Sequence, residues 1–154
     1  MEKLAEVEAA RALMTEAMAW SVMKWLREKK RVRRTADQAN AALDQLTGAV
    51  RQRWVDGVRV AYEALAAQAN GAASRRQGEQ PSQPVDGDAI VIARSVKQAD
   101  DEAYRARMDA EETFDEAERQ LSTSLALEGC RKAIHSWDLH EKAIRRAEAV
   151  CGSK

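Results

Sequence analysis

The sequence is short of the residues that interrupt helices and of those that typically fill sheets. Its 154 residues include two prolines, seven glycines and one phenylalanine, and most of its apolar side chains are alanine, leucine and valine. Alanine and leucine favour helices, whereas glycine and proline are the residues that a helix interior tolerates least. The composition therefore predicts an all-α protein, and the length suits a single domain over residues 1–154.

The sequence also lacks an excess of charge and a long apolar run. Lysine plus arginine and aspartate plus glutamate number 25 each, so no overall field attracts nucleic acid or anionic lipid. The apolar runs fall far short of the roughly 20 residues that span a bilayer. The first residues lack the basic and apolar segments of a secretory signal. We therefore expect a cytoplasmic protein without a transmembrane segment.

Cysteines are scarce, and their spacing argues against a disulfide within the chain. Cys130 and Cys151 lie in one predicted helix, whose rise of about 1.5 Å per residue places them roughly 31 Å apart. A disulfide requires Cα atoms within about 7 Å. We expect both residues to be small, buried hydrophobes with reduced thiols, and an intermolecular bond through Cys151 is the alternative.

Histidine is equally scarce, and the familiar catalytic motifs are missing. His135 and His140 point about 140° apart around a helix, so they cannot chelate one ion as an i, i+4 pair would. The sequence contains no Glu-x-x-His motif of di-iron bundles, no Cys-x-x-Cys, no phosphate-binding loop and no nucleophile elbow. It predicts no enzyme, no metal, no cofactor and no small-molecule substrate. A metal or catalytic site around His135, Asp138 and His140 is a weaker hypothesis.

A polar segment divides the chain almost in half. Residues 71–87 contain both prolines and three of the seven glycines, a composition typical of flexible connections. The segments on either side, residues 1–70 and 88–151, have helical composition throughout. The sequence therefore predicts two helical hairpins joined by a flexible polar linker.

Helix-capping signals suggest where each half turns. Thr35 and Gln38 have the spacing of a capping box, which predicts a new helix near Ala36. Short hydroxyl side chains at Ser122, Thr123 and Ser124 are suitable N-caps for another. The expected helices cover residues 3–31, 36–69, 88–120 and 123–151. One uninterrupted helix in each half, forming a long two-helix coiled-coil hairpin, is the alternative.

Apolar residues recur every three or four positions in all four expected helices. The four stripes are Val7, Met14, Met18, Val22 and Trp25; Leu43, Leu46, Val50, Trp54, Gly57, Ala61 and Leu65; Val96, Ala99, Ala103, Ala106, Ala110, Thr113 and Ala117; and Cys130, Ala133, Trp137, His140, Ile144, Ala147 and Cys151. This spacing is typical of nearly parallel helix packing. It predicts an antiparallel four-helix bundle.

The charges are balanced overall but separated along the chain. Residues 1–70 carry a net charge of +3, residues 88–121 carry −5 and residues 122–154 carry +2. The candidate basic contact patch consists of Arg27, Lys29, Lys30, Arg31, Arg33 and Arg34. The candidate acidic interaction face consists of Asp109, Glu112, Asp115 and Glu116. An up-and-down bundle places the two clusters at the same end, where each is expected to compensate much of the other.

The charge pattern allows two classes of function. Helical seams and separated charges favour a non-enzymatic protein that acts by protein–protein association, as an adaptor, a chaperone-like partner, a structural subunit or a self-associating oligomer. Six clustered cations also suit a small subunit of a nucleoprotein complex that contacts the phosphate backbone. The tryptophans that precede the cations fall on the expected buried face, which makes them poor candidates for stacking on bases.

Overall fold

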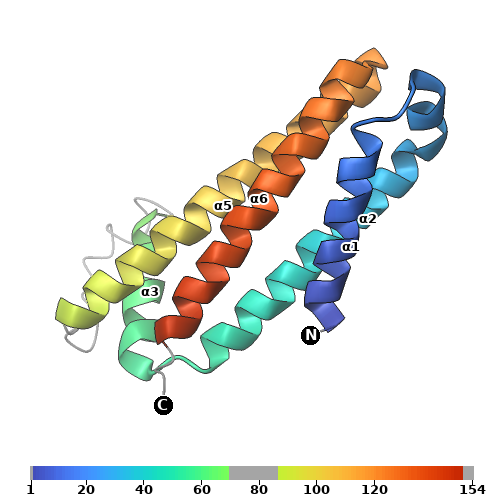
Figure 1. The fold of residues 1–154 in the computed structure, drawn as a ribbon. Helices are drawn as coiled ribbons and strands as arrows, with labels where there is room; N and C mark the ends of the chain where they lie inside the picture. Colours follow the sequence, from blue (N-terminus) through green and yellow to red (C-terminus); the bar gives the residue numbers. More distant parts are fainter. Residues whose placement is uncertain (1, 70–86, 151–154) are drawn as a thin grey trace.

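The computed structural model describes residues 2–69 and 87–150, and it confirms the all-α class (Figure 1). Within these ranges five helices pack together: α1 Glu2–Ala17, α2 Val22–Gln52, α3 Asp56–Ala69, α5 Gly87–Gln120 and α6 Thr123–Val150. Apart from Gly87, which begins α5, the linker expected over residues 71–87 lies outside the described residues. Cys151 also lies outside them.

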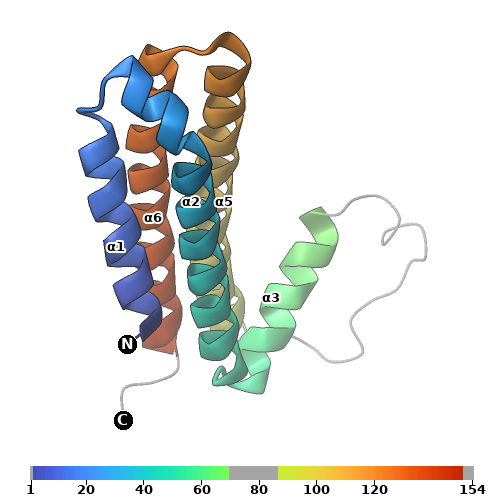
Figure 2. The same ribbon diagram turned by 90° about the vertical axis from the view of Figure 1, so that its right-hand side faces the viewer.

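Four of the helices lie side by side, and the shorter α3 leans against one end of the group (Figure 2). Helices α5 and α6 form an antiparallel hairpin with contact along most of their length, and α1 pairs with α2. Both α1 and α2 also pack against α6, while α3 packs against α5. Helix α6 therefore joins α1 and α2 to the second half of the chain, and the contact between α3 and α5 is a second connection.

The expected helix boundaries in the second half are confirmed. Helices α5 and α6 are separated by two residues, Leu121 and Ser122. The Leu125 amide donates a hydrogen bond to the Ser122 hydroxyl oxygen at 3.2 Å, as expected for an N-cap. Leu121 has a φ of 51°, the left-handed conformation that commonly ends a helix. Local capping chemistry therefore determines this turn.

The helix break expected near Thr35 is wrong, because α2 runs through it without interruption. Val32, Ala36, Ala39 and Leu43 are all buried on one stripe of α2. Ending the helix at Thr35 would rotate one half of this stripe out of the core. A capping interaction contributes only about 1 kcal/mol, so the burial of four apolar side chains prevails over the local signal.

The first half instead breaks at two other places, so it contains three helices rather than two. Ser21 caps α2, with its hydroxyl oxygen accepting a hydrogen bond from the Lys24 amide at 3.2 Å. At the other end of α2, the Arg59 Nη2 atom donates to the carbonyl oxygens of Arg51, Gln52 and Trp54 at 3.1–3.2 Å. These breaks also rule out one long helix in the first half, and with it the two-helix hairpin alternative.

Val22 is a second correction, because it was expected on the buried face of the first helix. It is 49% exposed at the start of α2. The break at residues 18–21 separates it from the apolar stripe of α1 and changes the direction in which it points. Trp25, expected on the same face, is buried at 3% exposure.

Small side chains line the contact between α5 and α6, as the seam pattern predicts. Alanine occupies many of the buried positions in both helices, and Trp137, Cys130 and Phe114 fill the remaining space. Helix α6 also contains Gly129, over which the Phe114 ring lies. Of the seam positions expected on α6, His140 is only half-buried, because it borders a cleft.

None of the helices in the described ranges is both long enough and apolar enough to cross a membrane.

Candidate functional site

A polar cleft of about 400 Å³ lies between α2 and α5. Both helices pack against α6 rather than closely against each other, and the space between them is open. The walls are provided by Asp44, Thr47, Gly48 and Arg51 of α2, Tyr62 of α3, Asp100, Asp101, Ala103, Tyr104 and Arg107 of α5, and His140 of α6. Four helices from both halves of the chain therefore meet at one site.

Arginine–carboxylate contacts bridge α2 and α5 at three levels. Arg33 of α2 donates to Asp115 at 3.1 Å and Glu118 at 3.0 Å. The other two bridges border the cleft. Arg107 of α5 donates to both carboxylate oxygens of Asp44 on α2, at 3.2 and 2.8 Å, and Arg51 donates to Asp100 at 2.9 Å. Polar bridges therefore connect these two helices at several points along their length.

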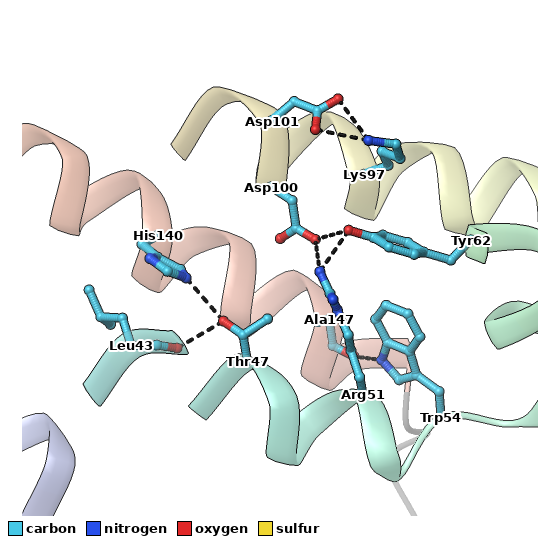
Figure 3. A network of polar contacts seen from close by, with 10 residues as sticks. All are labelled: Leu43, Thr47, Arg51, Trp54, Tyr62, Lys97, Asp100, Asp101, His140 and Ala147. Atoms are coloured by element: carbon cyan, nitrogen blue, oxygen red, sulfur yellow. Dashed lines mark hydrogen bonds and ion pairs between the residues drawn. The ribbon is translucent and has the colours of Figure 1, made fainter. Parts of the chain in front are cut away.

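Tyr62 closes one end of the cleft through a compact group of contacts (Figure 3). Its hydroxyl donates to Asp100 Oδ2 at 2.5 Å and accepts a hydrogen bond from Arg51 at 2.7 Å. The Arg51 guanidinium lies 4.7 Å from the Tyr62 ring centroid, a cation–π distance. Burial, reinforced by the hydrogen bond to Asp100, raises the pKa of Tyr62 well above its ordinary value. The tyrosine therefore acts as a neutral donor.

The Trp54 ring packs against the Tyr62 ring. The two rings lie 5.3 Å apart at an interplanar angle of 60°, and the Trp54 indole nitrogen donates to the carbonyl oxygen of Ala147 on α6 at 3.0 Å. A second cleft, of about 520 Å³, lies on the far side of Arg51 and Tyr62. These two side chains therefore form a wall between two adjoining spaces.

His140 joins three helices through a chain of hydrogen bonds, and its tautomer follows from the order of the chain. The Thr47 hydroxyl donates to the Leu43 carbonyl oxygen at 2.9 Å, so it must accept from His140 Nε2, 3.0 Å away (Figure 3). Arg107 then donates to His140 Nδ1 at 3.3 Å. An imidazole that donates through Nε2 and accepts through Nδ1 is neutral.

The surroundings of His140 favour that neutral form. Burial, together with the nearby positive charges of Arg107 and Arg51, lowers the pKa of His140, while Asp44 and Asp100 oppose the shift. A second proton would occupy Nδ1, displace the hydrogen bond from Arg107 and place two positive charges side by side. The ring therefore contributes hydrogen bonds rather than charge to the cleft.

The residues of the expected basic patch have different environments. Arg33 turns towards α5, Arg31 pairs with Glu28 at 3.0 Å, and Lys29 lies 5.8 Å from the centroid of the Trp25 ring. Arg27, Lys30 and Arg34 are exposed and form no ion pair within residues 2–69 and 87–150. The expected compensation by α5 therefore occurs mainly through Arg33.

The expected acidic face is mostly compensated within the chain. Asp109 pairs with Lys132 at 3.1 Å, Asp115 pairs with Arg33, and Glu116 pairs with Arg119. Glu112 is exposed and forms no ion pair in the part of the chain that the structure describes. The free charge at this end of the molecule is therefore predominantly positive.

His135, Asp138 and His140 do not form a common site. His135 is exposed, Asp138 pairs with Arg11 of α1, and His140 faces the cleft. No cluster of three or more metal-ligating side chains occurs among the described residues. The hypothesis of a metal or catalytic centre at these three residues therefore lacks the required convergence.

The sequence reasoning missed most of the cleft residues. Arg51, Asp100 and Tyr62 lie on different helices, and no short motif connects them. Asp44, Thr47, Gly48 and Arg51 form a row of mostly polar residues beside the apolar stripe of α2, but such a row is also typical of a helix face in water, so it does not indicate a cleft.

Comparisons with known proteins supply no further assignment: the chain matches no protein-family model, no curated protein and no solved structure.

Proposed function

We propose that this protein is non-enzymatic and acts by protein–protein association, through a basic face on α2 that binds an acidic protein surface. The face consists of Arg27, Lys30, Arg31 and Arg34. Their i, i+3, i+4 and i+7 spacing places them on one side of the helix, and all four are exposed. The observation that carries the proposal is that three of the four have no carboxylate partner among the described residues.

Exposed apolar side chains extend this basic face towards the end of the molecule. Met23, which lies four residues before Arg27 and on the same side of the helix, is 63% exposed, and Val22 is 49% exposed. Interfaces between proteins commonly combine an apolar centre with a polar rim. A partner helix with carboxylates on one face and an apolar residue at its end matches this arrangement.

A distinct protein partner suits the charges better than a second copy of the chain. Three of the four expected acidic-face residues are already paired internally, so the acidic face of a second copy offers only Glu112 as a carboxylate without an ion pair among the described residues. Charge complementarity of this kind increases association rates and specificity more than affinity. The expected binding is therefore moderate in strength and weakened by salt.

A labelled, glutamate-rich helical peptide tests the proposal, with single-stranded RNA of equal charge as the competing ligand. The triple variant R27E/K30E/R34E should weaken peptide binding by at least about tenfold, which corresponds to 1.4 kcal/mol. The matched control is R94E/R105E/K142E. It makes the same change in net charge at three exposed residues that have no ion pair within the described ranges, and it should bind like the wild type.

Three outcomes contradict the proposal. Equal losses in the two triple variants would show that only net charge matters. Tight RNA binding with a steep salt dependence, abolished by R27E/K30E/R34E, would support the nucleoprotein hypothesis instead. A concentration-dependent rise in mass during sedimentation would favour self-association. Circular dichroism of each variant confirms that its helices remain intact.

The finer architecture is part of the same proposal. We assign α1, α2, α5 and α6 to one antiparallel four-helix bundle within a single domain, with α3 as an appended helix. The support is that both α1 and α2 contact α6, which in turn pairs with α5. This arrangement leaves the basic face of α2 directed away from the core.

A further inference from the structure

We propose that a small pocket at one end of the molecule binds a carboxylate on a short apolar chain. The pocket has a volume of about 170 Å³ and lies where the connection between α1 and α2 meets the start of α6 (Figure 2). It shares no residue with the basic face of α2, so the proposal does not depend on that face. Its volume is below the range of about 300–1,000 Å³ that is usual for drug-sized ligands, so it suits a ligand of a few heavy atoms.

The pocket wall contains a buried hydrogen-bond donor that has no acceptor. Trp25 lines the pocket and is 3% exposed, and its indole Nε1 atom has no hydrogen-bond partner among the described residues. Trp20, the other tryptophan of the lining, differs because its Nε1 atom donates to Glu16 at 3.2 Å. A buried polar group without a partner is unfavourable. Because an indole nitrogen can only donate, the missing partner is an acceptor such as a carboxylate oxygen.

The start of α6 adds backbone donors to the same pocket. Thr123 and Ser124, the first two residues of α6, line it. The Ser122 hydroxyl accepts from the Leu125 amide, whereas the amides of Thr123 and Ser124 have no hydrogen-bond partner within residues 2–69 and 87–150. Free amides and the positive end of the helix dipole favour an anion at this position.

The charged groups beside the pocket also favour an anion. Among the described residues, no charged side chain lines the pocket itself. The Nζ atom of Lys24 lies 5.3 Å from the centroid of the Trp20 ring, and that of Lys29 lies 5.8 Å from the centroid of the Trp25 ring. Neither lysine forms an ion pair in the described part of the chain. Together with Glu16, which contacts Trp20, they leave one excess positive charge beside the pocket.

The rest of the lining is apolar and favours an organic anion over an inorganic one. Ala17, Met18, Ala126 and Leu127 provide hydrocarbon groups, which bind a hydrocarbon chain favourably. A short-chain carboxylate places its charge at the donors and its chain against these walls. The glutamate side chain has the same chemistry, so the ligand is either a free short-chain acid or a side chain of a partner protein.

Three probes of similar size test the proposal at neutral pH: propanoate, propanamide and propylammonium. They represent the anion, a neutral acceptor and the cation. Binding is followed by NMR, in which the indole N–H resonance of Trp25 reports directly on the unpartnered donor. Propanoate should bind best, with a dissociation constant in the millimolar range expected for so few atoms. It should shift this indole resonance together with the amide resonances of Thr123 and Ser124.

Two substitutions with matched controls locate the binding. W25F removes the unpartnered indole donor but keeps an aromatic ring, and it should weaken propanoate binding by about tenfold, the usual effect of losing a hydrogen bond to a charged group. W20F makes the same change at an indole that already donates to Glu16, and it should bind propanoate like the wild type. K29E should weaken binding by about fivefold, whereas K30E changes the exposed neighbouring residue and should have little effect.

The glutamate-rich helical peptide then distinguishes the two sources of the carboxylate. A carboxylate supplied by a partner protein predicts that W25F weakens the binding of the peptide as well as that of propanoate. A free acid predicts that W25F weakens the binding of propanoate alone. Failure of the basic-face proposal would abolish peptide binding without changing the propanoate titration, so the two proposals fail separately.

Three results overturn the proposal. They are a Trp25 indole resonance that propanoate does not shift, binding of propanamide or propylammonium at least as tight as that of propanoate, and equal affinities of W25F and W20F for propanoate. Should W25F fail to fold, the comparison of K29E with K30E decides the question, and equal affinities of these two variants overturn the proposal.

Discussion

Gly129 of α6 lies against the aromatic ring of Phe114 on α5, so closely that a β-carbon at residue 129 would stand 2.8 Å from the ring Cδ1 atom. Phe114 is buried at 3% exposure, and the Arg33 guanidinium lies 5.4 Å from its ring centroid. The contact joins the α5–α6 hairpin to the arginine that bridges α2 and α5. We therefore expect the stability of the fold to depend strongly on the size of the side chain at residue 129.

The first prediction concerns this contact. G129A should lower the free energy of unfolding by about 1–3 kcal/mol, the usual cost of overpacking a core, because the buried ring must move to admit the methyl group. Denaturation in urea measures the change. Stability equal to or greater than that of the wild type would contradict the observed approach of the two helices.

The opposite sign is expected for the same substitution in α2. G48A adds a methyl group where no atom lies within 4 Å, and alanine is favoured over glycine within a helix by about 1 kcal/mol. The melting temperature should rise by roughly 2–4 °C for a chain of this size. A fall in the melting temperature would show that the cleft is closed at this position.

His140 should make stability depend on pH. Because its pKa is lowered in the folded protein, the unfolded chain binds more protons at pH values between the folded pKa and 6.5. The contribution of His140 is therefore fully present above about pH 6.5 and is lost as the pH falls towards the folded pKa. Urea denaturation of the wild type and H140Q across this range measures it.

The control for that experiment is H135Q, which changes the exposed histidine of the same helix. H135Q should retain the acid-dependent loss of stability, whereas H140Q should reduce it. Carboxylates that titrate at lower pH contribute in all three proteins and cancel in the comparison. Identical slopes in the wild type and H140Q would contradict the neutral, hydrogen-bonded ring.

Cys130 should be unreactive in the folded protein. It is buried and reduced, and burial raises the pKa of its thiol to about 11, so little of the reactive thiolate exists near neutral pH. In a C151S background, where Cys130 is the only cysteine, a thiol reagent should react only when urea unfolds the chain. Rapid reaction without denaturant would place Cys130 at the surface.

The sequence predicted the second half of the fold more accurately than the first because its signals there agree. At Ser122 the capping residue coincides with the end of an apolar stripe. At Thr35, in contrast, the capping signal falls in the middle of an apolar stripe that continues through Val32, Ala36 and Leu43. Burial of that stripe outweighs a cap. Ser21 is the N-cap of α2. Because apolar residues occur on both sides of it, the sequence pattern did not indicate a helix end there.

The basic face and the cleft differ in how far the sequence could predict them. Helical spacing alone places Arg27, Lys30 and Arg34 on one side of α2, but only the structure shows that Arg33 turns to α5. The cleft depends on which helices pack closely, and charged side chains such as Arg51 and Asp100 give no sequence signal of their distant partners.

The most direct test of the central claim is an NMR titration of the protein with the glutamate-rich helical peptide at low salt. Amide resonances of residues 22–34 on α2 should shift, while those of Gly48, Tyr104 and His140 in the cleft should not. High salt should reverse the shifts, because the contact is largely electrostatic. Shifts confined to other helices, or no shifts in wild-type protein that remains folded, would contradict association through the basic face of α2.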